Sequence, residues 1–150
     1  MNIGVFETVP VLLEKLKSQR SLNPFGKHMT LERARQGGTY DLFISDRPHT
    51  PDPLPFSAQL YLFPPNARTV TPPSKGQVLL CGMSAWDDLS FSSIGEENAF
   101  LCLQKEIIFC QKSIVPFEKK IPLDRNFDLY KNMASGLIFA LAEMIFAEEA

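Results

Sequence analysis

An acid, a guanidinium and an imidazole occur together at the end of one predicted strand, in Asp46-Arg47-Pro48-His49. Such a trio can bind an anion, because arginine binds phosphate and carboxylate groups bidentately and histidine exchanges protons near neutral pH. Ligands of open α/β sheets collect at the carboxyl ends of the strands, which is where this segment falls. The alternative is structural: Asp46 and Arg47 pair with each other or cap the turn, and His49 is solvated.

A thiol and a hydroxyl follow another predicted strand, at Cys81 and Ser84. Either could act as a nucleophile with His49 as its base, which would make the chain a hydrolase or transferase. The G-x-S-x-G motif is absent, however, and a cysteine in an apolar strand more often belongs to the core. We therefore predict no catalytic residue. The ligand-binding candidates are Asp46, Arg47, His49 and Ser84.

Motifs that would identify a cofactor are absent from the sequence. Neither G-x-x-x-x-G-K-[ST] nor G-x-G-x-x-G occurs, and the cysteines and histidines lack the C-x-x-C and H-x-x-x-H spacings of zinc sites. Of the adjacent pair Asp87-Asp88, only one carboxylate could face a given cation, because neighbours on an extended chain point in opposite directions. The cofactor is therefore unknown, and we predict no metal site.

The composition fits one globular domain in a reducing compartment. The chain has 150 residues, of which 45% are hydrophobic and 21% are charged, and this is enough to bury a core without metals or disulfides. The three cysteines are odd in number and lie mostly in apolar stretches, as buried free thiols do. The N-terminal residues lack the basic start of a signal peptide, so we expect a cytoplasmic location.

The charge balance argues against a nucleic-acid partner. With 15 basic and 17 acidic residues the formal net charge is -2, which offers no basic surface to a phosphate backbone. The longest apolar stretch, 133–147, contains polar residues and is shorter than the roughly 20 residues that span a bilayer, so we expect no membrane partner. The partners that we consider are a small anionic ligand and a second copy of the chain.

The elements that would position these residues begin with a βα-type first third. An apolar run at 2–6 predicts a strand, and an amphipathic helix follows it, with Thr8 as its cap and Pro10 in its first turn. The segment YDLFIS at 40–45 predicts a second strand, parallel to the first.

Between these two strands the pattern is less regular. Residues 20–29 have no clear period and fit a loop or a weak strand. A second helix is predicted over LERARQ at 31–36, with Thr30 as its cap and Gly37-Gly38 as its end.

The middle of the chain is rich in proline. Eight of the 12 prolines fall within 48–73, so this segment must be extended and rich in turns, and it could form a lid or wall over a ligand. Only AQLYLF at 58–63 can pair as a strand there. The following QVLLC at 77–81 predicts a buried strand.

Three β-rich segments follow, at 89–94, 99–109 and 113–123. The last two predict an antiparallel hairpin, because their connector is too short for a crossover helix. A helix from about 124 to 147, capped by Asp124 or Asn126, ends the chain. Its apolar residues cover more than one face, so it is either wrapped by the sheet or shared with a second subunit.

Together these elements predict a single α/β domain over residues 1–150. We expect a Rossmann-like mixed sheet in two or three layers, in which a parallel N-terminal βα part meets a C-terminal antiparallel hairpin and a long C-terminal helix.

The second half also carries a recognisable series of elements. A strand ends in a glycine-containing turn and leads into a β segment rich in Asp and small residues, VLLCGMSAWDDLSFSSI; the strand NAFLCLQ and the helix NMASGLIFALAEMI follow. This series, at 78–146, resembles the later part of the central domain of Mur ligases. The P-loop and the metal-binding residues of those ligases have no counterpart here. The resemblance therefore implies a shared scaffold, and ligase activity does not carry over.

Three functions remain open from the sequence. The first is a binding module that holds a small anionic metabolite or nucleotide near the four candidate residues. The second is a protein-interaction or homo-oligomeric role that uses the C-terminal helix or exposed strand edges. The third is the hydrolase or transferase described above. We favour the binding module, because polar residues at strand ends are present and a complete catalytic set is not.

Overall fold

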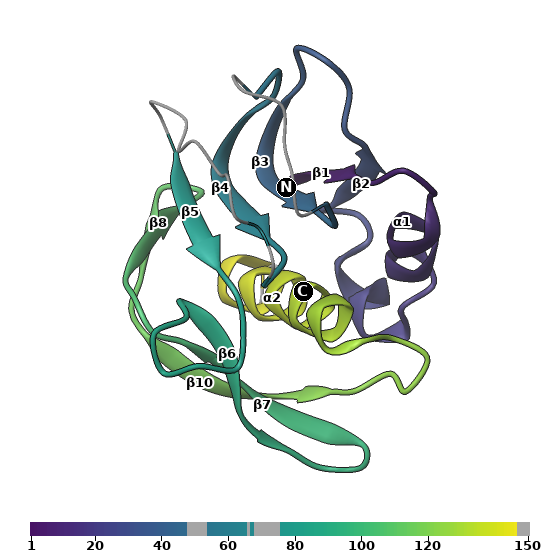
Figure 1. Ribbon diagram of the computed structural model, residues 1–150. Coiled ribbons are helices and arrows are strands. Elements are labelled where there is room, and N and C mark those ends of the chain that lie inside the picture. Colours follow the sequence, from purple (N-terminus) through teal and green to yellow (C-terminus); the bar gives the residue numbers. More distant parts are fainter. Residues whose placement is uncertain (48–53, 66, 68–75, 147–150) are drawn as a thin grey trace.

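Figure 1 shows the computed structural model, which describes residues 1–47, 54–65, 67 and 76–146. One long helix crosses the middle of the molecule, with a parallel sheet on one side and antiparallel strands on the other (Figure 1). The chain is therefore mixed α/β, as its sequence predicts.

The first half of the chain forms a five-stranded parallel sheet. Its strands are β1 (Asn2–Phe6), β2 (Thr30–Arg33), β3 (Thr39–Ser45), β4 (Ser57–Phe63) and β5 (Gln77–Leu80). Their order in space is β2-β1-β3-β4-β5. The strand expected at 40–45 lies parallel to the first, with Val5 opposite Ile44, as predicted. Because β2 and β3 flank β1 on opposite sides, the direction in which the sheet grows reverses between β1 and β3.

The second half supplies the antiparallel strands. These are β6 (Leu89–Ile94), β7 (Asn98–Leu103), β8 (Ile107–Phe109), β9 (Lys112–Ile114) and β10 (Phe117–Pro122). The predicted hairpin is confirmed in two parts, because β7 pairs with β10 and β8 pairs with β9. A parallel bridge between Cys81 and Leu89 connects the end of β5 to β6.

The helix predicted at 31–36 is wrong, because residues 31–33 belong to β2. Thr30 to Arg33 pair with Asn2 to Val5 of β1, and this pairing outweighs a local helical pattern of only two turns. The glycines act in the turn to β3: Gly37 has a φ of 77°, which glycine adopts without strain, and its N–H donates to the Pro55 carbonyl.

The N-terminal helices are short. The amphipathic helix is α1 (Val11–Lys17), and it buries its leucines against the sheet. The segment 20–29, for which the sequence allows a loop or a weak strand, contains instead the 3-10 helix η1 (Arg20–Phe25).

The central helix, α2 (Leu129–Phe146), lies between the parallel sheet, which its Tyr130 contacts, and the antiparallel sheet of β6, β7 and β10. It begins later than expected, because 124–128 form a loop that the buried Asn132 holds by hydrogen bonds to the carbonyls of Asp124, Phe127 and Asp128. By length and mean hydropathy (18 residues, 1.2), α2 is the one described helix that could cross a membrane, yet 61% of it is buried inside the fold. A core helix of a soluble protein has the same properties.

The two faces of the parallel sheet bury different side chains. On the face toward α1 and α2, aliphatic residues such as Val5, Ile44 and Leu62 join the main core. The other face carries an aromatic cluster made of Tyr40, Phe43, Phe56, Tyr61 and Phe63. Leu54 and Ala67, two described residues of the proline-rich segment, pack against this cluster.

Candidate functional site

The candidate site lies where the parallel strands end against the start of α2. The Tyr130 hydroxyl on α2 donates to the carbonyls of Ser45, at the end of β3, and of Leu62, near the end of β4. We call this edge the carboxyl rim. It includes the reversal point between β1 and β3, and open α/β sheets bind their ligands outside such a point.

Asp46 is the first rim residue after β3. Its N–H donates to the Phe6 carbonyl at 3.2 Å, which places it beside the end of β1. Burial, helped by the negative charge of Glu7, raises the pKa of the Asp46 carboxyl, while Arg47 and Lys131 act in the opposite direction. Asp46 therefore lies within reach of α2, from which Lys131 comes.

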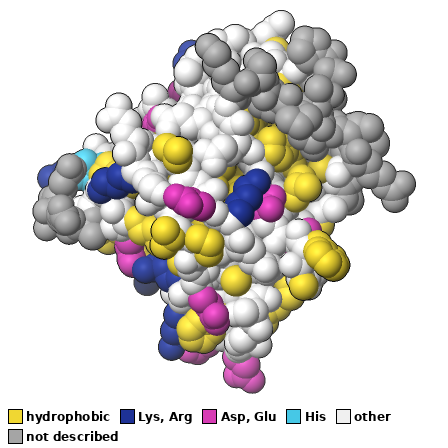
Figure 2. All heavy atoms as spheres, turned by 90° about the vertical axis from the view of Figure 1, so that its left-hand side faces the viewer, with side chains coloured by type: hydrophobic (Ala, Val, Ile, Leu, Met, Phe, Trp, Pro, Cys, Tyr) yellow, Lys and Arg dark blue, Asp and Glu magenta, His cyan; other side chains and the backbone are white. Residues whose placement is uncertain are grey.

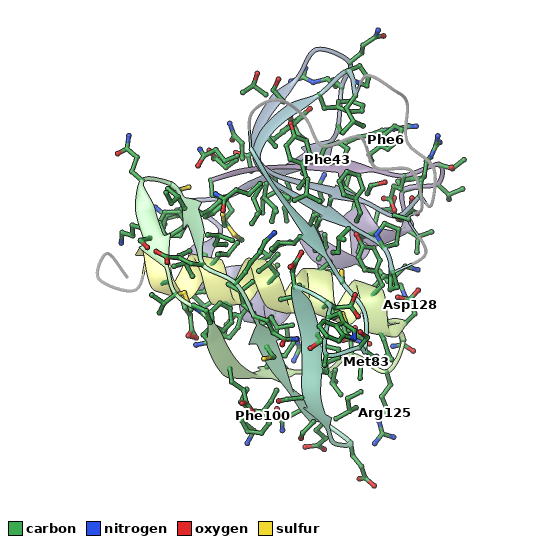
Figure 3. The ribbon with its side chains drawn as sticks, turned by 60° about the vertical axis from the view of Figure 1, so that its left-hand side comes forward. Phe6, Phe43, Met83, Phe100, Arg125 and Asp128 are labelled. Carbon is green, nitrogen blue, oxygen red and sulfur yellow. The ribbon has the colours of Figure 1, made fainter. Side chains whose placement is uncertain are left out.

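Arg47 lies toward the aromatic face of the sheet. Its guanidinium carbon is 4.6 Å from the centroid of the Phe6 ring, and Phe6 in turn packs on Phe43 and Phe56. Figure 3 shows Phe6 and Phe43 together in the upper part of the molecule, away from α2. Asp46 and Arg47 thus share the rim but contact different faces of the sheet, as neighbours on an extended chain do.

One atom of Arg47 lacks the partner that its burial requires. Nε is buried and finds no hydrogen-bond acceptor among the described residues. The backbone N–H of Arg47 is satisfied, because it donates to Ser45 Oγ at 3.1 Å. A buried N–H without an acceptor is uncommon in folded proteins, and it costs about 1–3 kcal/mol.

Glu7, which sequence reasoning missed, is a buried acid at the end of β1. Its carboxylate oxygens accept from the N–H groups of Leu12 and Leu13, both at 2.9 Å. Glu7 therefore caps α1, and the prediction of Thr8 as the cap is wrong: the side chain that caps the helix comes from one residue earlier. An acid three or four residues before an apolar helical run was the available signal.

At the start of α2 the cap is Asp128 and not Asp124 or Asn126. Asp128 Oδ1 accepts from the Lys131 N–H at 2.8 Å, and Oδ2 lies 3.8 Å from Lys131 Nζ. Because the loop delays the helix, the expected caps fall outside it. Lys131 thus brings a positive charge to the rim.

Ser84 belongs to a turn of its own. Its N–H donates to Asp87 Oδ2 at 2.9 Å and its hydroxyl accepts from the Trp86 N–H at 3.0 Å. Among the described residues it has no contact with Asp46 or Arg47, so these groups do not converge on one point. Asp88 Oδ2 accepts from the Leu80 N–H, so both aspartates hydrogen-bond to the backbone of the turn and of the strand before it.

Cys81 is a core residue. It is 2% exposed, and its thiol donates to the Phe63 carbonyl at 3.2 Å. Burial, with the charges of Asp87 and Asp88, raises the pKa of this thiol, so it stays protonated. A protonated, buried thiol is a poor nucleophile.

His49 lies outside the described residues. Within the described part of the chain, no three metal-ligating side chains come together.

Comparison of the chain with protein-family models, with curated proteins and with solved structures found no match. The resemblance to Mur ligases therefore stays a prediction.

The raised pKa of Asp46 predicts a pH-dependent effect of Asp46→Asn. The folded protein keeps this proton to a higher pH than the unfolded chain, so wild type loses stability as pH rises from the ordinary value of 3.8 through the folded pKa. The variant should melt at a higher temperature than wild type at neutral pH and at the same temperature in acid below that ordinary value. Thermal unfolding followed by circular dichroism tests this, with the exposed Glu97→Gln as control. An equal rise in melting temperature at both pH values would contradict this prediction.

Proposed function

We propose that this chain is a binding module for a small anionic metabolite or nucleotide, held at the carboxyl rim by Arg47. The observation that carries the proposal is the buried Nε of Arg47, which lacks an acceptor among the described residues. A carboxylate or phosphate oxygen would satisfy it and could bond to a second guanidinium nitrogen at the same time.

The surroundings of Arg47 support the proposal. The guanidinium of Arg47 packs over the Phe6 ring. Because this contact already restricts the side chain, less rotamer freedom is lost when an anion binds. The position at the reversal between β1 and β3 is where a Rossmann-like sheet would bind its ligand.

The other rim residues suggest what else the ligand carries. Asp46 can accept a hydrogen bond from a hydroxyl group, as the ribose of a nucleotide offers, and Lys131 adds a second positive charge beside it. His49 and Ser84 stay in the proposal as candidate ligand contacts, although Ser84 would have to leave its turn to take part.

A thermal-shift screen of nucleotides, phosphates and carboxylates tests the proposal. A ligand at 100 times its Kd adds about 2.7 kcal/mol of stability, which is about 5–10 °C for a chain of this size. Arg47→Ala should abolish the shift. Arg33→Ala, which removes an exposed arginine on β2, should leave it intact. If no compound shifts wild type, or if Arg47→Ala keeps every shift, the proposal fails.

Self-association is a second candidate, favoured by the apolar residues that stay exposed. On α2 these are Leu129 and Met144, 43% and 38% exposed, near its two ends. Figure 2 shows the face that carries β5 and β8, where hydrophobic side chains form separate groups with charged side chains between them. Light scattering at several concentrations distinguishes the candidates: a mass that stays at 16.9 kDa would exclude self-association and leave the binding proposal untouched.

A further inference from the structure

A cavity of about 400 Å³ lies between residues 18–21 and residues 122–125, and its lining does not include Asp46 or Arg47. The first segment runs from the end of α1 into the first residues of η1, and the second leads from β10 toward α2. Figure 1 shows the second connection passing beside η1 at the lower right. The volume is within the range of small-molecule sites, roughly 300–1,000 Å³.

The acidic group of this cavity, the Asp124 carboxylate, is held in place by hydrogen bonds. Asp124 Oδ2 accepts from Gln19 Nε2 at 3.3 Å, and Oδ1 accepts from the Asn126 N–H at 2.9 Å. Lys15 Nζ donates to the Asn126 carbonyl at 2.9 Å, which ties α1 to the same loop. These bonds connect the two walls, so the cavity is built before any ligand arrives.

Two arginines, one from each wall, outweigh the single negative charge of Asp124. The side chain of Arg20 makes no hydrogen bond or ion pair with any described residue. Arg125 donates from Nε to the Glu96 carbonyl at 3.3 Å, and its terminal nitrogen lies 3.9 Å from Glu96 Oε2. Figure 3 shows Arg125 extended at the lower edge of the molecule, beside the β6–β7 turn that carries Glu96.

The contact between Arg125 and Glu96 is weak. Their side chains are 74% and 92% exposed, and exposed ion pairs of this kind contribute little to stability. Arg125 can therefore exchange Glu96 for another anion at small cost. Two guanidinium groups on opposite walls suit a dianion with several acceptor oxygens, and a phosphate group offers these.

We propose that this cavity binds a phosphate monoester between Arg20 and Arg125, and that Glu96 competes with the ligand for Arg125. The Ser21 hydroxyl lies in the same wall as Arg20 and is available as a further donor. This site is separate from Arg47 and does not depend on the function proposed for the carboxyl rim.

A titration of the ¹⁵N-labelled chain with inorganic phosphate at constant ionic strength tests the proposal. The amide signals of 18–21 and 122–125 should shift and saturate in the millimolar range. Arg20→Ala and Arg125→Ala should each weaken binding about tenfold, which is the loss of about 1.4 kcal/mol expected for one charged contact. Arg47→Ala should leave these shifts unchanged, so a failure at the carboxyl rim is distinguishable from a failure here.

The competition by Glu96 supplies the sharper test. Glu96→Gln should tighten phosphate binding several-fold, because it removes the negative charge that pairs with the terminal nitrogen of Arg125 and leaves only the bond from Nε to the Glu96 carbonyl. Glu97→Gln makes the same change of charge one residue away, in a side chain that has no contact with Arg125, and should have a smaller effect. If both variants tightened phosphate binding equally, the cause would be the change in net charge, and the proposed competition between Glu96 and the ligand would be wrong. The absence of saturable shifts, or shifts that persist in the double variant of Arg20 and Arg125, would overturn the site.

Discussion

Replacing Tyr130 with phenylalanine is expected to lower the free energy of unfolding by about 2 kcal/mol. The hydroxyl is buried and donates to two carbonyls, Ser45 O and Leu62 O. Phenylalanine fills the same space but leaves these carbonyls without their donor at the carboxyl rim, and a buried polar group without a partner costs about 1–3 kcal/mol. Urea denaturation of wild type and variant measures the difference.

The loss of unfolding free energy expected for Tyr130→Phe should not depend on pH over the neutral range. Burial raises the pKa of the Tyr130 hydroxyl well above its ordinary value, so the group remains a donor. Tyr61→Phe is the comparison, because among the described residues the Tyr61 hydroxyl bonds only to the nearby backbone of Phe56 and Ala58. Tyr130→Phe alone should speed amide hydrogen exchange at the start of α2. A loss below about 0.5 kcal/mol, within the range of neutral surface changes, would show that the hydroxyl does not hold α2 to the sheet.

The second large effect is expected for Glu7→Ala, which should lower the free energy of unfolding by about 2–3 kcal/mol. The carboxylate is buried and receives the N–H groups of Leu12 and Leu13, and hydrogen bonds to a charged acceptor contribute about 1.5–3 kcal/mol. Alanine removes both acceptors and the negative charge that favours a helix N-terminus. Urea denaturation again measures the loss.

Two matched variants separate the possible causes of this loss. Glu7→Gln keeps one acceptor oxygen and should lose about half as much as Glu7→Ala, because one helical N–H then faces an amide nitrogen. Glu14→Ala removes an exposed acid from the first turn of the same helix. If Glu14→Ala cost as much as Glu7→Ala, the charge near α1 and not the buried cap would be responsible.

Both large effects depend on contacts that sequence reasoning did not find. Tyr130 lies in a segment predicted to be helical, but its two acceptors are 85 and 68 residues away. Glu7 is close to its partners in sequence, yet Thr8 was an equally good local cap. Contacts between distant residues, and choices between equivalent neighbours, need the packed structure.

At the candidate site, too, some features could be predicted from the sequence and others needed the packed structure. That Asp46 and Arg47 follow a strand was predictable from the apolar run at 40–45 and from its sharp end. Which face each side chain would occupy was not, because the register of β3 is set by its pairing with β1 and β4. This register sends Arg47 to Phe6 and brings Asp46 under the influence of Lys131.

The sequence by itself determined the class of the fold, the strands at 2–6 and 40–45, the antiparallel hairpin and the long final helix. Each of these has a local signal: an apolar run or a helical period that is long enough to outweigh its alternatives. Only the tertiary structure decided that 30–33 form an edge strand, that Glu7 caps α1 and that α2 lies between the parallel sheet and the antiparallel sheet of β6, β7 and β10. In these places the local preferences are nearly balanced, and the free energy of pairing with β1 or of burial between the sheets decides the outcome.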